Sequence, residues 1–304
     1  MRSGPRSSVR RGRLETAEKG GNESMSSANG FGLAGIIGMP VAHSRSPTIH
    51  NFWLNAHGIR GAYVPLAVRP ERLKEALPGL VGLGFRGCNV TMPHKQTAMQ
   101  LLDRVNDTAR RIGAVNTIVV EENGTLSGFN NDGNGFVQSL KDAKPDWRAD
   151  AGPILLLGAG GASRAVVVAL LENGATQIRI ANRTAEKAQA IAAEFGSVVT
   201  TVPWADRGAA LADVALLVNC TDRGMIGKDA LEIDLSRLDP ATLAADLIYT
   251  PLETPFLSEA RARGCLTVNG LGLLLNQARL AFRAWFGVMP DVTPELVKAI
   301  QATF

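Results

Sequence analysis

The chain has 304 residues, 45% of them apolar and 20% charged, a composition typical of a globular protein and long enough for two domains. No apolar run reaches the ~18–20 residues that a membrane span needs, which excludes a helical membrane protein and leaves no expected membrane partner. The net charge of +4 comes mostly from residues 1–24, with six basic and three acidic residues, so the rest is nearly neutral and unsuited to binding nucleic acid.

Residues 1–30 are rich in Ser, Gly and Arg, lack apolar periodicity and are predicted to form a disordered leader. They contain no apolar signal-peptide core, whereas an organelle transit peptide and a true start at Met25 both stay open. The cysteines Cys88, Cys220 and Cys265 are odd in number and far apart, which is typical of reduced thiols in a cytoplasmic protein. Neither they nor the histidines have metal-ligand spacing, so we expect no metal site.

From Leu33 onward, strand patterns alternate with helical patterns, which predicts an α/β fold with mostly parallel sheets. The first half is expected to contain strands at 33–37, 63–67 and 87–90, helices at 46–57, 70–79 and 93–102, and a hairpin of 114–120 with 125–127. Gly128–Gly135 is rich in Gly and Asn and is interpreted as the hinge between two domains, followed by a connecting helix at 136–141.

The second half continues the alternation. Its expected strands are 154–157, 177–181, 198–202, 215–219, 244–248 and 266–268, and its expected helices are 165–171, 185–195, 255–264 and 271–286. The last helix is apolar on one side and is expected to pack on the first domain. We therefore predict two α/β domains flanking a cleft, the first formed by residues 31–132 plus 271–304 and the second, of Rossmann type, by residues 133–270.

The most informative stretch is the strand Ile154–Leu157, which runs directly into Gly158 and then into a helical pattern. Gly158 permits a tight turn, and Gly160 lets a bound group approach the backbone. The free N–H groups of the following helix would face a pyrophosphate there. Ser163 occupies the third small position, where Gly or Ala is usual, and a strand-turn-helix unit without a ligand is the alternative.

The choice of dinucleotide depends on the end of the next strand, where the sequence reads Asn182-Arg183-Thr184. An NAD enzyme usually has Asp or Glu at this place to bind a ribose hydroxyl. A guanidinium instead pairs with a 2′-phosphate, so Arg183 predicts NADP. The alternative for Thr184 is a cap of the following helix.

Other polar clusters follow strands of the first half, at the sheet edge where ligands of α/β proteins bind. Ser44 and Ser46 offer hydroxyls to an anion such as a carboxylate, unless Ser46 merely caps its helix. Lys95 is expected in a first helical turn, where the dipole disfavours a cation and favours a general acid/base. The alternative is a solvated surface lysine.

Asn116 and Asp132 complete the cluster of polar residues. Asp132 precedes a predicted helix and could be its N-cap. Its functional interpretation is a carboxylate that orients the Lys95 ammonium and binds a substrate hydroxyl. Such a pair suits proton transfer to an oxygen whose carbon exchanges hydride.

These motifs, taken together, resemble those of the shikimate dehydrogenase family from about Gly32 to Phe286. The matching segments are Ser-Arg-Ser-Pro at 44–47, Asn-Val-Thr-x-Pro-x-Lys at 89–95, Gly-Ala-Val-Asn-Thr at 113–117, Asn-x-Asp-Gly at 130–133, Gly-Ala-Gly-Gly-Ala at 158–162, Asn-Arg-Thr at 182–184, Asn-Cys-Thr at 219–221, Asp-Leu-Ile-Tyr at 246–249, Thr-Pro-Phe-Leu at 254–257 and Asn-Gly-Leu-Gly at 269–272 with Gln277.

The resemblance implies the reversible reduction of 3-dehydroshikimate to shikimate with NADPH, on the route to chorismate and the aromatic amino acids. It assigns Ser44, Ser46 and Tyr249 to the ring carboxylate, Lys95, Asn116, Asp132 and Gln277 to ring hydroxyls, with Thr91 nearby, and it makes Lys95 the proton donor and Asp132 its partner. The resemblance also assigns the cofactor. It places the pyrophosphate at Gly158, Ala159, Gly160, Gly161 and Ala162, and the 2′-phosphate side at Asn182, Arg183, Thr184, Ala185, Glu186 and Lys187. It places the nicotinamide between Leu247 and Gly270, and Asp107 near the cofactor.

The sequence departs from the family pattern at four positions: His94, Asn131, Asp222 and Leu273, where an apolar residue, Thr, Ser and Met are usual. His94 and Asn131 adjoin the two catalytic candidates and could change the ring preference. A quinate/shikimate dehydrogenase and a non-catalytic NADP-binding regulator therefore stay open as alternatives. The resemblance suggests a monomer or a homodimer.

Overall fold

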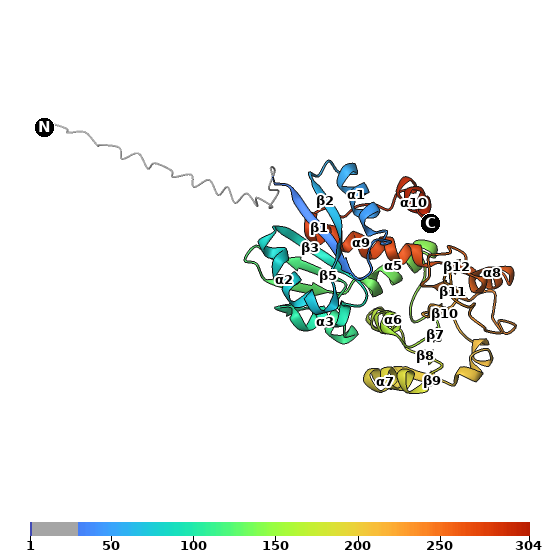
Figure 1. Ribbon diagram of the computed structural model, residues 1–304. Coiled ribbons are helices and arrows are strands. Elements are labelled where there is room, and N and C mark those ends of the chain that lie inside the picture. The colour runs from blue at the N-terminus through green and yellow to red at the C-terminus, as the bar shows by residue number, and fades with distance from the viewer. Residues whose placement is uncertain (2–29) are drawn as a thin grey trace. The chain divides into compact units, whose positions relative to one another are not determined.

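The computed structural model describes Met1 and residues 30–304, so the predicted disordered leader lies outside the described residues except at its two ends. Phe31–Phe304 form one compact unit that contains two six-stranded sheets (Figure 1). The predicted α/β class with a Rossmann-type second half is confirmed.

The first sheet has the strand order β2-β1-β3-β5-β6-β4. Its strands are β1 (Gly32–Gly38), β2 (Gly61–Ala67), β3 (Phe85–Val90), β4 (Arg104–Val105), β5 (Thr117–Val120) and β6 (Leu126–Phe129). β1 pairs parallel with β2 and β3, whereas β5 runs antiparallel to β3 and β6, as the predicted hairpin requires. One face packs on α1 (Ser46–Ala56), and the other packs on α2 (Leu73–Gly82), α3 (Lys95–Leu101) and α4 (Asp107–Ile112).

The second sheet is entirely parallel and has the order β12-β11-β10-β7-β8-β9. Its strands are β7 (Ile154–Leu157), β8 (Ile178–Ala181), β9 (Val199–Val202), β10 (Leu216–Asn219), β11 (Leu243–Asp246) and β12 (Leu266–Val268). Ile154 and Leu156 face α5 (Asp132–Ala143), α6 (Gly161–Glu172) and α7 (Ala185–Phe195). Leu155 and Leu157 face the opposite side, towards α8 (Pro255–Ala262). Because both faces of the sheet are covered, the central strand β7 is apolar and buried throughout.

Helices α5 and α9 (Gly270–Phe286) lie side by side (Figure 1) and connect the two sheets through their packing. Phe136 and Leu140 of α5 belong to the core of the second sheet, whereas Phe282 and Trp285 of α9 belong to that of the first. Trp285 also donates from Nε1 to the carbonyl of Ile118, 2.9 Å away. The prediction that this last long helix returns to the first sheet is confirmed.

The expected hinge at Gly128–Gly135 stays a prediction, whereas the helix expected to follow it at residue 136 begins earlier: β6 ends at Phe129 and α5 begins at Asp132. Gly133 and Gly135 serve close helix packing. A Cβ on Gly133 would lie 2.5 Å from the carbonyl oxygen of Ala165, and one on Gly135 would lie 2.7 Å from the amide of Gln277. Glycine is needed there so that α6 and α9 can approach α5.

Several other boundaries differ from the predictions. The helix expected from Pro93 begins at Lys95, because the preceding residues form a turn in which the His94 amide donates to the Thr91 carbonyl. α2 continues to Gly82 rather than ending at residue 79. The short strand β4, the helix α4 and a final helix, α10 (Pro294–Gln301), were not predicted.

The division into domains at residues 132 and 270 stays a prediction, since the chain from Phe31 onward forms one contact unit. Among the described residues, no helix combines the length and the apolar character needed to cross a bilayer.

Candidate active site

A pocket of about 220 Å³ lies where residues from both sheets meet. It is lined by Ile36, Ser44, Arg45, Ser46, Asn89, Val90, Thr91, Lys95, Asn116, Asp132, Leu247, Tyr249, Leu273, Leu274 and Gln277. Every residue that the sequence assigned to the substrate is in this set. The structure therefore brings together side chains that are up to 233 positions apart, from Ser44 to Gln277.

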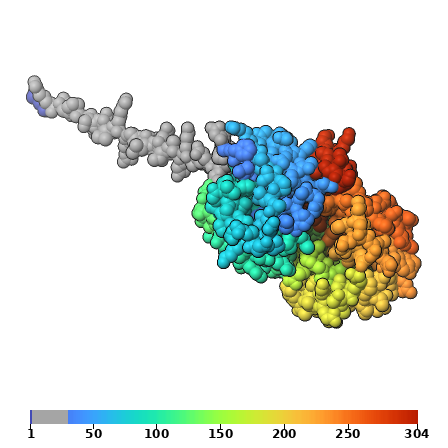
Figure 2. Space-filling model, viewed as in Figure 1, coloured from blue at the N-terminus to red at the C-terminus, as the bar shows by residue number. Residues whose placement is uncertain are grey.

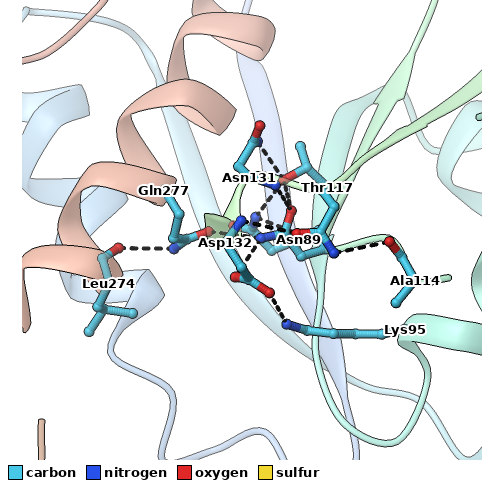
Figure 3. Close-up of polar contacts among 10 residues, drawn as sticks. Asn89, Lys95, Ala114, Thr117, Asn131, Asp132, Leu274 and Gln277 are labelled. Atoms are coloured by element: carbon cyan, nitrogen blue, oxygen red, sulfur yellow. Dashed lines mark hydrogen bonds and ion pairs between the residues drawn. The ribbon is translucent and has the colours of Figure 1, made fainter. Parts of the chain in front are cut away.

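Lys95 and Asp132, which both line the pocket, form an ion pair with Nζ 2.6 Å from Oδ2 (Figure 3). Each is the first residue of its helix, α3 for Lys95 and α5 for Asp132. The Lys95 side chain is 31% exposed and that of Asp132 is 23% exposed, so both are partly shielded yet open to a ligand. Lys95 is therefore not a freely solvated lysine, and Asp132 makes no side-chain cap of α5, whose N-cap is Asn131.

Asn116 holds the second oxygen of the Asp132 carboxylate. Its Nδ2 donates to Asp132 Oδ1 at 2.8 Å and to Gln277 Oε1 at 3.4 Å. Its Oδ1 accepts from the Thr117 hydroxyl at 2.8 Å and from the Asn131 amide at 3.0 Å. Asn116 is 3% exposed, so this network fixes the orientation of its side chain between the Asp132 and Gln277 oxygens.

Ser44, Arg45 and Ser46 also line the pocket. The Ser44 hydroxyl oxygen accepts from the Ser46 amide at 3.2 Å, and the N-cap of α1 is Arg45, without a side-chain cap bond. The alternative in which Ser46 only caps the helix is therefore wrong. Burial raises the pKa of the Tyr249 hydroxyl, and the positive charge of Arg45 nearby opposes that rise.

A second, larger pocket of about 480 Å³ surrounds the glycine turn after β7. It is lined by Gly158, Ala159, Gly160, Asn182, Arg183, Thr184, Lys187, Trp204, Arg207, Cys220, Thr221, Asp222, Arg223, Asp229, Ala230, Leu231 and Glu232. Gly158 has a φ of +108°, and a Cβ there would lie 2.9 Å from Thr221. Nothing lies within 4 Å of a Cβ built on Gly160, which caps α6 with no side chain. The start of α6 therefore leaves backbone N–H groups open to an anion.

Asn182 connects the glycine turn to the end of β8. Its Oδ1 accepts from the Ala159 amide at 3.1 Å, and its Nδ2 donates to the Thr184 carbonyl at 2.7 Å. Thr184 stands at the N-cap position of α7, as the capping alternative expects, but its side chain makes no capping hydrogen bond. Arg183 is exposed at the pocket. The buried Ser163 hydroxyl donates to the Gly158 carbonyl at 2.8 Å, which explains how a serine fits the third small position.

The remaining cofactor candidates are spread more widely. Leu247 lines the smaller pocket, and a Cβ on Gly270 would overlap its carbonyl oxygen, so these two residues touch. Gly161, Ala162, Ala185 and Glu186 belong to the first turns of α6 and α7 but line neither pocket. Asp107 begins α4 with a fully exposed side chain 3.7 Å from Arg110, and it also lines neither pocket.

Two of the four departures lie away from the pockets. His94 is 1% exposed with its Nε2 2.7 Å from the Val68 carbonyl, and the side-chain Nδ2 of Asn131 donates to the Thr117 hydroxyl at 3.1 Å. Leu273 lines the smaller pocket and Asp222 the larger one, so these two departures are the ones that face ligands.

Sequence reasoning missed several lining residues. Arg45 stands between Ser44 and Ser46, which the sequence did indicate as anion-binding candidates, so a positive charge beside them was an available signal. Thr221 follows β10, where its hydroxyl donates to Asn219 Oδ1 at 2.7 Å. Asn219 in turn donates to Asp246, and burial raises the pKa of that carboxyl group to about 6. Arg207 and Trp204 stack at 4.4 Å beside the larger pocket, and no local motif marks them.

A parallel sheet with an open glycine turn, next to a pocket holding a Lys–Asp pair, defines an α/β dehydrogenase with a dinucleotide site. Three family models match: "Shikimate dehydrogenase substrate binding domain" over residues 36–118, "Shikimate / quinate 5-dehydrogenase" over 142–247 and "Shikimate 5'-dehydrogenase C-terminal domain" over 270–294. The chain belongs to the shikimate dehydrogenase family.

Individual relatives agree with this assignment. The shikimate dehydrogenase (NADP(+)) of Paracoccus denitrificans is 50% identical over 270 residues, which cover 89% of this chain and 96% of that protein. The structure of shikimate 5-dehydrogenase from Thermus thermophilus with NADP(H) and shikimate is 39% identical, with a TM-score of 0.80 over 90% of this chain and 100% of that one. Quinate dehydrogenase from Corynebacterium glutamicum, in complex with NAD, is 32% identical with a TM-score of 0.82, covering 90% and 98% of the two chains.

Proposed function

We propose that the protein catalyses the reversible reduction of 3-dehydroshikimate to shikimate with NADPH. The observation that carries this proposal is the Lys95–Asp132 pair, 2.6 Å apart, in a pocket rimmed by the serines Ser44 and Ser46. Relatives named shikimate dehydrogenase (NADP(+)) cover almost the whole chain beyond the leader, which supports the same reaction.

The residues around the glycine turn fit NADP. The amides of Gly158 and Ala159 already donate to the Ala181 carbonyl and to Asn182 Oδ1. The N–H groups for the pyrophosphate are therefore those from Gly160 onward, where the space in front of the glycine is open and α6 adds the positive end of its dipole. Arg183 and Lys187 line the same pocket as cations for the 2′-phosphate. Leu247 and Gly270 are proposed to flank the nicotinamide, which supplies hydride when it is bound.

Lys95 is the proposed general acid. In the reductive direction its ammonium gives a proton to the substrate oxygen, while the carbon that bears this oxygen is reduced, so a hydroxyl group results. Asp132 keeps the ammonium in place and accepts a hydrogen bond from a ring hydroxyl. Asn116 and Gln277 orient the ring through their amides, with Thr91 at the same wall, and Ser44, Ser46 and Tyr249 bind the carboxylate.

One assay tests this function against its alternatives. Purified protein is given shikimate or quinate, each with NADP⁺ or NAD⁺, and reduced nicotinamide is followed by its absorbance. Fastest turnover of shikimate with NADP⁺ supports the proposal. Faster turnover of quinate, the acid after which the Corynebacterium enzyme is named, would replace the proposed activity with that of a quinate dehydrogenase. Binding of NADPH without turnover of either acid would indicate a regulator.

Location and assembly are part of the proposal too. We propose a cytoplasmic enzyme, because Cys88, Cys220 and Cys265 are all free and burial raises the pKa of the Cys220 thiol to about 12, so the thiols are unreactive. A homodimer and a monomer are the two assembly states that the resemblance implies, and sedimentation velocity of the purified protein distinguishes them.

A further inference from the structure

Arg45 is a cation at the pocket that the proposed function does not use. It lies between Ser44 and Ser46 in sequence and lines the same pocket as Lys95 and Tyr249. Lys95 is paired with Asp132, whereas no carboxylate of the described residues lies within ion-pair distance of Arg45. The unbalanced positive charge of the pocket therefore comes from Arg45, on the rim that carries the two serines.

The Arg45 side chain is held by Phe304. Its guanidinium carbon lies 5.5 Å from the centre of the Phe304 ring, which is a cation–π contact. The same ring lies 6.0 Å from that of Tyr249. Arg45 precedes α1 on the first sheet and Tyr249 follows β11 of the second, so one phenylalanine contacts side chains from both sheets.

Helix α10 and the turn that follows it fix the backbone just before Phe304. α10 begins at its N-cap Thr293, whose hydroxyl accepts from the Leu296 amide at 3.3 Å, and Leu296 and Ile300 are fully buried in the core around α1. Beyond the helix, the Thr303 hydroxyl and amide both donate to the Ile300 carbonyl, at 2.6 and 2.9 Å. Figure 2 shows α10, in dark red, against the early part of the chain in blue.

We propose that Arg45 is a further substrate-binding residue, whose guanidinium pairs with the substrate carboxylate, and that Phe304 is the positioning residue that holds it beside Tyr249. This rests on the proposed function, because it assumes a carboxylate-bearing substrate. Serine hydroxyls are neutral donors, whereas a guanidinium adds charge and can bind both carboxylate oxygens. The Ser44 oxygen already accepts from Ser46, so its hydroxyl proton is free to act beside Arg45.

The test compares shikimate with its methyl ester, which keeps the ring hydroxyls and loses the charge. In Arg45→Gln, KM for shikimate is expected to rise about 10- to 100-fold, the effect of one charge-assisted hydrogen bond pair, while kcat changes little. Affinity for the ester, measured as KM or as an inhibition constant, is expected to stay unchanged. Equal losses for acid and ester, or no loss for either, would overturn the assignment of Arg45 to the carboxylate.

Phe304→Leu isolates the positioning part. It keeps the bulk but removes the ring face, so KM for shikimate is expected to rise about 2- to 5-fold, and Phe304→Tyr to restore it. In an Arg45→Gln background, Phe304→Leu is expected to add nothing. An unchanged KM in Phe304→Leu, or an equal rise in both backgrounds, would show that Phe304 does not act through Arg45.

The control is Arg72→Gln, which removes the same charge from an exposed side chain paired with Glu75 outside both pockets. It is expected to leave both affinities unchanged. Failure of the proposed function is a separate result, because the unaltered protein would then not turn over shikimate at all.

Discussion

Lys95 Nζ lies 2.6 Å from Asp132 Oδ2, and the two residues are the first of helices α3 and α5. The positive end of a helix dipole favours Asp132 and disfavours Lys95, so the carboxylate compensates for an ammonium placed where its own helix repels it. Asn116 holds the other carboxylate oxygen at 2.8 Å. Asn116 therefore orients the Asp132 carboxylate, and this carboxylate in turn orients Lys95, the proposed proton donor.

Asp132→Asn is expected to lower kcat for shikimate about 10²-fold, since the amide cannot hold the ammonium as an ion pair and can place a donor against it. Asn116 retains an oxygen to donate to, so the thermal midpoint is expected to change little. Asp150→Asn, at an exposed pair with Arg148, is the matched control. Unaltered kcat in Asp132→Asn would exclude the carboxylate from the reaction.

Arg183→Gln tests the choice of cofactor. Loss of a guanidinium that pairs with the 2′-phosphate is expected to raise KM for NADPH about 10- to 100-fold and to leave KM for NADH nearly unchanged. The ratio of the two values from steady-state kinetics is the measurement. A parallel rise for both cofactors would mean that Arg183 contributes to folding or to the adenine side instead.

Gly135→Ala tests the packing of α5 on α9. The added methyl group would lie 2.7–2.9 Å from Gln277 and Leu273, so we expect a loss of roughly 1–3 kcal/mol in unfolding free energy, measured in urea. Gly79→Ala is the helical control, because nothing lies within 4 Å of its Cβ and alanine favours a helix by ~0.5–1 kcal/mol. Opposite signs are expected. A neutral or stabilising Gly135→Ala would contradict close helix contact.

His50 gives the pH dependence of stability a defined component. It is fully buried, stacks on Tyr63 with ring centres 4.2 Å apart, and burial lowers its pKa from 6.5 to about 3. Between these values the unfolded chain binds a proton that the folded chain does not. The contribution of the neutral ring is therefore complete above pH 6.5 and decreases as the pH falls toward 3, with a slope of at most ~1.4 kcal/mol per pH unit.

Asp246 acts in the opposite direction, because burial raises its pKa from 3.8 to about 6 and its contribution decreases as the pH rises through that range. The test measures the unfolding free energy of His50→Phe and of the unaltered protein at about pH 8 and about pH 5. The loss of stability between the two pH values is then compared between the two proteins. We expect the variant to lose less stability on acidification, with His50→Leu as a second version. Equal losses in the two proteins would mean that the His50 ring takes up a proton as readily in the folded protein as in the unfolded chain.

The strand-turn-helix unit at Ile154–Leu157 and its glycines could be predicted from sequence because the signal is local: an apolar run, a glycine and a helical period. Helix α4 was missed because its six residues bury only Ala109 and Ile112, too few for a period. The start of α5 was missed because Gly133 and Gly135 disfavour helices, and only contact with α6 and α9 explains them.

Ser44, Lys95 and Asp132 could be predicted as a set, because they follow β1, β3 and β6, whose carboxyl ends lie at one edge of the first sheet. Asn116 precedes β5, which runs antiparallel and therefore starts at this edge, and Gln277 of α9 was assigned by the resemblance alone. The partners of these residues could not be predicted. That Asn116 bridges Asp132 and Gln277 depends on how α9 returns to the first sheet, and that Phe304 touches Arg45 depends on α10. Neither arrangement leaves a local signal, because both join residues far apart in the chain.

The most direct test of the account is the turnover of Lys95→Ala with shikimate and NADP⁺, measured together with shikimate affinity. We expect kcat to fall by roughly 10²–10⁴, the usual contribution of a general acid/base, while the unfolding midpoint and NADP⁺ affinity stay close to those of the unaltered protein. A variant that turns over shikimate at nearly the original rate would contradict the central claim that the Lys95 ammonium transfers the proton.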